Sequence, residues 1–157
     1  MVKHSFKKDH QSGKRGEAIF ADYLSRKGFK FEDVSENKEY QDDDVDFVVE
    51  SKLGKKVSFE VKNDSMIHKT GNIFYESISN VDHNTVGCFE KTKSEFMVIC
   101  SEPSSVFYIA KSDFLREYVK ENKNNLRYIS RVPGSNSAGY LIPVKNIRDN
   151  VKILSFN

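Results

Sequence analysis

The chain has 157 residues, enough for one domain with one hydrophobic core, and its 38% hydrophobic and 31% charged residues are typical of a soluble protein. It contains no apolar run near the ~20 residues of a transmembrane helix, and its basic N-terminus lacks the apolar centre of a secretory signal. A net charge of +2 does not by itself indicate nucleic acid, and two cysteines without such a signal favour the reducing cytoplasm.

The N-terminal segment, residues 1–15, is predicted to be a basic arm. The segment contains one acid, Asp9, and five cations. They are Lys3, Lys7, Lys8, Lys14 and Arg15. Such an arm can neutralise nucleic-acid phosphates, and a solvated, frayed terminus explains the same composition.

A helix is predicted over residues 16–28. Its apolar residues recur at helical spacing, and Gly28 is a natural C-terminal stop. The apolar stripe consists of Ile19, Phe20, Tyr23 and Leu24.

Three strands follow, at residues 29–34, 45–51 and 57–63. The polar segment 35–44 predicts a loop, and Gly54 lies in a turn that joins the last two strands into a hairpin.

The second half of the chain predicts another hairpin and another helix. The hairpin joins residues 95–100 and 106–110, and Ser112 is the expected N-cap of a helix over 113–122. Further strand-like segments are 72–79, 126–132 and 140–147, and 86–93 reads as a short helix. The sequence therefore predicts a single α/β (α+β) domain over 1–157, with a central mixed sheet of about five or six strands flanked by helices.

The segment VSFEVKN (57–63) combines a strand pattern with charges. Apolar and polar residues alternate, so Glu60 and Lys62 share one face. The pattern Glu-x-Lys occurs four times in the chain, but the other three copies lie in a polar loop, at a strand end and at a helix end. The copy inside an apolar strand is the one that needs an explanation.

Asp46 directly precedes the apolar run of the preceding strand. A three-residue turn would place Asp46 opposite Lys62 and Val48 opposite Glu60 in an antiparallel pair, so that the three charged side chains meet on one face. A one-residue slip in the pairing would separate them.

Two carboxylates at this spacing repel each other unless a hard divalent cation lies between them. Mg²⁺ binds a few carboxylate oxygens together with waters and phosphate oxygens, and it activates water for attack. Lys62 beside it would orient or deprotonate that water, or stabilise the developing negative charge. A cross-strand charge cluster on a solvated face explains the same residues without a metal.

Asp46 at a strand start, a hairpin, and then FEVK with Glu60 and Lys62 resemble the PD-(D/E)xK nuclease superfamily. The resemblance covers residues 14–64. Within the superfamily, the arrangement of these residues is similar to that in Holliday junction resolvases and small phage endonucleases. It implies a restriction-endonuclease-like core in which Asp46 and Glu60 hold the metal and Lys62 assists the attack of water. It also implies that Glu17, on the preceding helix, completes the metal site.

Some positions depart from the family pattern or have a second interpretation. Val45 stands where the motif has proline. Glu17 is also explained as a first-turn acid that interacts favourably with the helix dipole. Three further acids compete for the role of Asp46, which we prefer because it adjoins the apolar strand. They are Asp42, Asp43 and Asp44.

Residues beside the motif are candidates for contact with nucleic acid. Thr70 and Asn72 can donate to phosphate and Lys69 can neutralise it, although a Gly-Asn turn between two strands explains Asn72 better. Glu76 is a further candidate for this wall of the site. The predicted DNA-binding residues are Lys14, Arg15, Asn63, Lys69, Thr70 and Asn72.

These observations predict a Mg²⁺-dependent endodeoxyribonuclease, with Mn²⁺ able to substitute, that cuts branched or site-specific duplex DNA. A small nuclease that cuts both strands usually acts as a homodimer, with one site per strand. The expected location is the cytoplasm of a bacterium, an archaeon or a phage-infected cell. The alternatives are a non-catalytic nucleic-acid-binding domain that retains a nuclease-like fold, and an RNA-directed nuclease.

Overall fold

The structure is a computed structural model that describes the backbone of residues 2–157 and the side chains of residues 10–157. The helices are α1 (Val2–Arg26), α2 (Lys38–Gln41), α3 (Ile67–Thr70), α4 (Cys88–Lys91) and α5 (Ser112–Asn122), with 3-10 turns at Lys123–Asn125, Val144–Asn146 and Arg148–Asn150. The strands are β1 (Lys30–Asp33), β2 (Phe47–Glu50), β3 (Lys56–Asn63), β4 (Asn72–Asn80), β5 (Thr85–Val86), β6 (Phe96–Ser101), β7 (Val106–Lys111), β8 (Arg127–Ile129), β9 (Ala138–Pro143) and β10 (Val151–Ser155).

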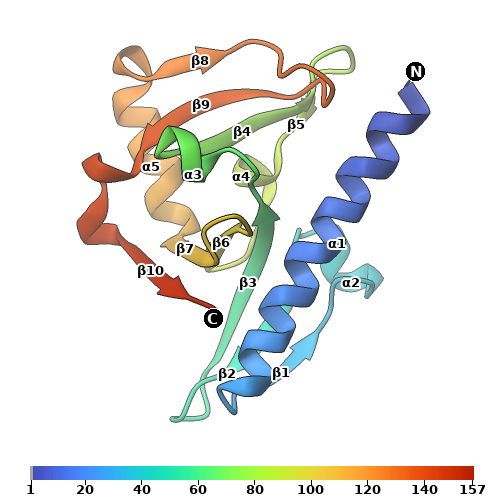
Figure 1. Cartoon of the computed structure of the whole chain (residues 1–157), viewed down its shortest axis with the longest axis vertical. Coiled ribbons are helices and arrows are strands. Elements are labelled where there is room, and N and C mark those ends of the chain that lie inside the picture. The colour runs from blue at the N-terminus through green and yellow to red at the C-terminus, as the bar shows by residue number, and fades with distance from the viewer. Residues whose placement is uncertain (1) are drawn as a thin grey trace.

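Two sheets organise the part of the chain that the structure describes. Six strands form a mixed sheet in the order β1-β2-β3-β6-β7-β10, in which β3 and β6 are parallel and the other neighbours antiparallel. The order β5-β4-β9-β8 gives a second, antiparallel sheet. Figure 1 shows α1 running along the first sheet and the second sheet above it. The predicted mixed α/β fold with a central mixed sheet is confirmed, whereas the second sheet and β10 were not predicted.

Helix α1 covers one face of the first sheet. Phe20 and Leu24 are buried against Phe47, Val49 and Val61, which confirms the predicted apolar stripe. Gly28, with φ 76°, ends the helix as predicted, and the Phe29 amide donates to the Leu24 carbonyl (3.0 Å).

The predicted start of this helix is wrong. The helix begins at Val2 instead of residue 16, so the backbone of residues 2–15, which belong to the predicted basic arm, continues the helix. That segment contains no proline, and Gly13 is its only glycine, so no strong helix breaker separates it from the apolar stripe.

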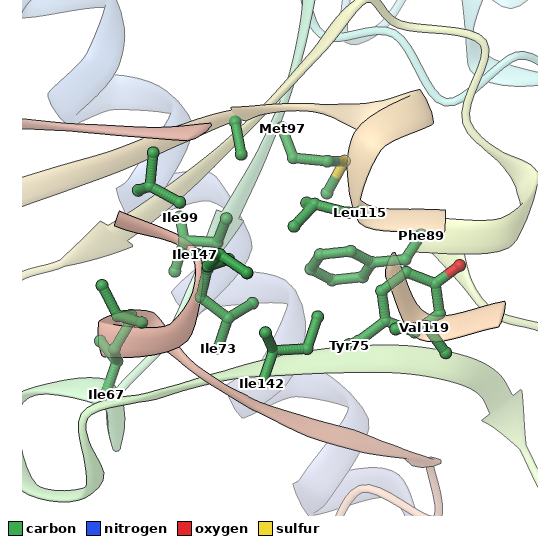
Figure 2. Packing of buried hydrophobic residues seen from close by; sticks show 13 residues of the cluster. Ile67, Ile73, Tyr75, Phe89, Met97, Ile99, Leu115, Val119, Ile142 and Ile147 are labelled. Carbon is green, nitrogen blue, oxygen red and sulfur yellow. The ribbon is translucent and has the colours of Figure 1, made fainter. Parts of the chain in front are cut away.

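The opposite face of the first sheet packs against α5 and the second sheet. Figure 2 shows Ile73, Tyr75 and Ile142 of the second sheet facing Met97 of β6 and Leu115 of α5, all of them buried. Because Glu60 and Lys62 pair in β3 with Met97 and Ile99, they lie on this same face, under the second sheet.

Smaller differences from the sequence prediction have local causes. The polar segment 35–44 contains α2, where the Asn37 side chain caps the Glu39 amide (3.0 Å). Ser112 is not an N-cap, because Lys111 occupies that position and the Ser112 hydroxyl lies 3.4 Å from that of Ser94. Within the described residues, none of the helices is both long and apolar enough to span a membrane.

Candidate active site

The hairpin of β2 and β3 brings Asp46 next to Glu60. Phe47 lies opposite Phe59, so the pairing differs by two residues from the predicted one and Asp46 is not opposite Lys62. An even shift preserves the faces, and the three charged residues remain neighbours. The Asp46 amide donates to the Phe59 carbonyl (2.9 Å), and the Val61 amide donates to Asp46 Oδ2 (2.8 Å). The Asp46 carboxyl group thus binds the β3 backbone where β2 ends.

Burial makes this carboxyl pair electrostatically unusual. Burial raises the pKa of Asp46 to about 6, against the hydrogen bond from Val61, and the Glu17 charge adds to the increase. Burial, followed by the charges of Asp46 and Asp44, raises the pKa of Glu60 well above its ordinary value. Glu60 Oε2 is also buried without a hydrogen-bond partner among the described residues. The pair therefore favours a shared proton or a bound cation over two bare charges.

Lys62 lies on the same face and contacts a residue from the second sheet. Its Nζ is 3.3 Å from Glu76 Oε2, and 38% of the Lys62 side chain is exposed. Charge interactions with Cys88, Glu76 and Glu60 raise the pKa of Lys62 against the opposing effect of burial. Because burial raises the pKa of Cys88 to about 12, its thiol is neutral at neutral pH, and the Glu76 carboxylate is the charge that holds the ammonium there. An ammonium held in this way is a poor base, so of the roles considered above, orienting water or stabilising negative charge fits this side chain better than deprotonating water.

Glu17 approaches the site from α1. It is 19% exposed, pairs with Lys14 (3.4 Å), and lies close enough to Asp46 to raise the pKa of that residue. The approach depends on Gly16, because a Cβ there would lie 3.1 Å from the Cβ of Asn63. That Glu17 completes a metal site stays a prediction.

Of the three competing acids, Asp44 is the one that lies close to Glu60. Its φ of 48° is in the left-handed region, and it pairs with Lys91 (3.7 Å). Burial raises the pKa of Asp44, partly offset by Lys91. Asp43 pairs instead with the exposed Lys93 (3.0 Å), and Asp42 is the exposed C-cap of α2.

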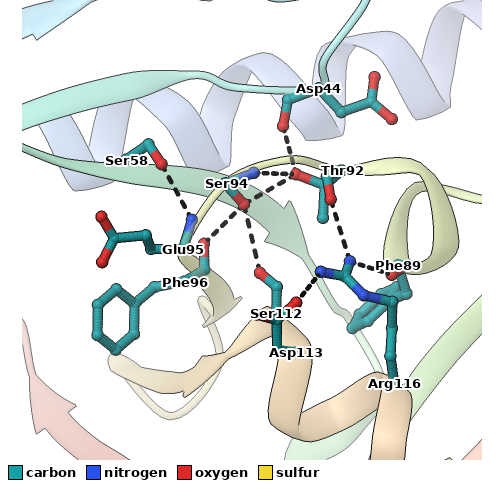
Figure 3. A network of polar contacts seen from close by, with 10 residues as sticks. All are labelled: Asp44, Ser58, Phe89, Thr92, Ser94, Glu95, Phe96, Ser112, Asp113 and Arg116. Carbon is teal, nitrogen blue, oxygen red and sulfur yellow. Dashed lines mark hydrogen bonds and ion pairs between the residues drawn. The ribbon is translucent and has the colours of Figure 1, made fainter.

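A polar network fixes the position of the Asp44 segment (Figure 3). The Thr92 hydroxyl donates to the Asp44 carbonyl (2.7 Å) and accepts from the Ser94 amide (3.0 Å). Arg116 of α5 donates to the carbonyls of Phe89 (3.1 Å) and Thr92 (3.0 Å). The segment before Asp46 is therefore tied to α4 and α5, and not to the hairpin alone.

The predicted DNA-binding residues come from four elements, α1, β3, α3 and β4. The Asn63 amide group donates to the Ser12 carbonyl (3.0 Å), so this half-buried side chain lies against α1, and its contact with DNA stays a prediction. Lys69 and Thr70 are exposed on α3, and Thr70 Oγ1 accepts from the Asn72 amide at the start of β4 (3.2 Å).

The basic arm is partly paired with acids. Lys14 lies 3.2 Å from Glu36 as well as near Glu17, and Arg15 lies 2.9 Å from Glu102. Burial opposes the charge of Lys14, but the two carboxylates outweigh it and raise its pKa. The side chains of Lys3, Lys7 and Lys8 lie outside the described residues.

The described side chains contain no group of three or more His, Cys, Asp or Glu residues arranged to hold a metal ion. An open depression of about 520 Å³ lies elsewhere, between the end of α1 and the β2–β3 turn, and contains none of the predicted site residues. The comparisons with protein-family models, curated proteins and solved structures gave no match to this chain. The site is therefore defined by its own geometry.

Sequence reasoning did not find two groups that act on Lys62. Glu76 was a candidate for the wall of the site, but nothing local in the sequence indicated its ion pair with Lys62, because β4 belongs to the other sheet. Cys88, at the start of α4, was not predicted to lie near the site, and no motif marks it.

Proposed function

We propose that the protein is a Mg²⁺-dependent endodeoxyribonuclease whose reaction centre is formed by Asp46, Glu60 and Lys62. The observation that carries the proposal is the buried pair of carboxyl groups with an ammonium two residues away. Burying two like charges is costly, and Glu60 Oε2 is buried without a hydrogen-bond partner among the described residues, so a cation would compensate a charge that the protein leaves unsatisfied.

The donor set fits a hard divalent cation. Mg²⁺ typically takes one or two carboxylates and completes its shell with waters and substrate phosphates, so a third protein ligand is not required. Asp46 and Glu60 would hold the ion, and the Glu17 charge, which acts on Asp46, would add to the negative potential that attracts it. A bound Mg²⁺ would polarise the phosphate and make water a better nucleophile.

The residues of the chain supply the remaining chemistry. Lys62, kept protonated by its neighbours, stabilises the negative charge that develops on the phosphate. The exposure of Lys62 supports access of a substrate, because 38% of its side chain is exposed.

A panel of linear, nicked, flapped and four-way DNA, with an RNA strand alongside, tests the proposal. Wild-type protein should cut DNA with Mg²⁺ or Mn²⁺, should bind without turnover in Ca²⁺, and should stop in EDTA, because Ca²⁺ is a poorer Lewis acid with looser geometry. Lys62→Met and Glu60→Gln should each lower kcat by about 10²-fold or more.

The same hairpin provides matched controls. Glu50 and Lys56 lie opposite each other at its far end, so Glu50→Gln and Lys56→Met should leave cleavage unchanged. Undiminished cleavage in EDTA, or full activity of either site variant, would contradict the proposal. Tight DNA binding without cleavage under all metal conditions would favour the non-catalytic alternative, and cleavage of RNA alone would favour an RNA-directed nuclease.

A further inference from the structure

Glu76 is a buried acid that the resemblance does not include. It lies in β4, beyond residues 14–64, and its carboxylate is 3.3 Å from Lys62 Nζ. The pair joins the two sheets, because Lys62 belongs to the first and Glu76 to the second. The ammonium of the proposed reaction centre is therefore held from outside the hairpin that carries it.

The backbone around Glu76 is built for a close approach. The pairing of β4 with β9 shifts register between Glu76 and Ile78, and such irregularities redirect side chains. Two glycines pack directly on this stretch. A Cβ at Gly87 would overlap the Glu76 carbonyl oxygen, and a Cβ at Gly139 would overlap the Tyr75 carbonyl oxygen. Both glycines are thus required for β4 to reach its position at Glu76.

We propose that Glu76 is a positioning residue, which fixes the Lys62 ammonium over the Asp46–Glu60 pair so that it meets the phosphate without reorganisation. This inference rests on the proposed function. Lysine has a flexible four-carbon stem, so its charge needs an external partner to hold one place. A charge already in place when the transition state forms is worth more than one that must be reoriented.

Kinetics of Glu76 variants test the role. Glu76→Gln keeps the size of the side chain and removes the charge, and it should lower kcat by at least about tenfold with little change in KM, given that a misplacement of about 1 Å can cost ~10²-fold. Glu76→Asp keeps the charge and should recover part of the loss. Asp82→Asn is the control, because it removes another carboxylate–cation pair in this part of the fold, that with Arg131 (2.9 Å).

A kcat for Glu76→Gln equal to that of Asp82→Asn would overturn the inference. So would a raised KM with an unchanged kcat, since that pattern indicates uniform binding of DNA and not placement of a catalytic charge. Equal losses in Glu76→Asp and Glu76→Gln would also count against it.

A second measurement does not depend on cleavage. The rate at which an acylating reagent modifies Lys62 is measured by mass spectrometry, with the exposed Lys152 as the internal reference. The acylation rate of Lys62 should rise in Glu76→Gln, because the lysine loses its partner. The rate should stay unchanged in Asp82→Asn. If the wild-type protein cuts no nucleic acid, the proposed function fails, and this measurement still decides whether Glu76 fixes Lys62. An unchanged Lys62 rate in Glu76→Gln overturns the inference whatever the kinetics show.

Discussion

Burial raises the pKa of both Asp46 and Glu60, and the charge of Asp46 raises that of Glu60 further. The hydrogen bond from Glu60 acts the other way on Asp46 and favours its ionised form. A carboxyl pair of this kind lowers the stability of the metal-free protein at neutral pH. A local loss of folding stability is expected at sites where residues are selected for chemistry rather than for stability.

The pH dependence of stability follows from the pKa of Asp46. Its folded value of about 6 lies above the ~3.9 of an unfolded chain, so the folded state binds the proton more tightly. The resulting stabilisation is complete below about pH 4 and is lost as the pH rises through about 6, at a cost on the order of 3 kcal/mol. We expect Asp46→Asn to remove most of this loss, measured by urea unfolding between pH 4 and 7.5 without divalent cations.

Asp149→Asn is the control for this experiment, because Asp149 is an exposed carboxylate distant in sequence from the site. It should leave the pH dependence as in the wild type. An unchanged pH profile in Asp46→Asn would show that Asp46 is not destabilised by its environment.

At the scale of the elements, the contact between α1 and β3 sets the place of Glu17. Gly16 lies against Asn63, and the Asn63 amide group bonds to Ser12 one helical turn earlier. The two residues hold the helix against the strand end. A residue predicted to contact DNA therefore serves to position the helix that carries Glu17.

The two glycines of α1 should respond differently to alanine. A Cβ at Gly13 meets nothing within 4 Å, so Gly13→Ala should stabilise the protein by about 0.5–1 kcal/mol through helix propensity. A Cβ at Gly16 lies 3.1 Å from Asn63, so Gly16→Ala should gain less, and Gly16→Leu should destabilise and reduce cleavage. Urea unfolding measures the first effect and DNA cleavage the second.

An equal gain in stability from both alanine variants would contradict a tight contact at Gly16. Full cleavage by Gly16→Leu would show that the distance between Glu17 and the carboxyl pair does not matter for the reaction.

At the scale of the whole molecule, the proposed reaction centre takes its residues from both sheets. The first carries Asp46, Glu60 and Lys62, while the second supplies Glu76, and α1 brings Glu17 from the side. If the proposed function holds, one such centre cuts one phosphodiester bond, so cutting both strands of a duplex requires a second copy or a second encounter.

A mixing experiment tests whether two copies act together. Wild-type protein mixed with inactive Glu60→Gln should accumulate nicked DNA if a symmetric dimer provides one site per strand. Sedimentation at the same concentrations should then show a dimer. Double-strand cleavage that falls only in proportion to the wild-type fraction, without nicked intermediates, would indicate independent monomers.

The sequence alone determined the features that depend on local periodicity. Alternation in residues 57–63 fixed which side chains share a face, and the turn at Gly54 fixed the hairpin. The predicted register was wrong by two residues. The charged side chains still lie on one face of the sheet, because the side-chain period of a strand is two. The stripe of α1 was found for the same reason, since its spacing is helical.

Only the tertiary structure decided what covers each face. The second sheet pairs Asn72 with Pro143 and brings Glu76 to Lys62, and no local pattern encodes a pairing between segments so distant in sequence. Nothing local in the sequence predicts that Asn63 packs against α1. Periodicity reports that a face is buried or shared, but the partner that buries it is chosen by the packing of the whole chain, and the environment of Lys62 depends on that choice.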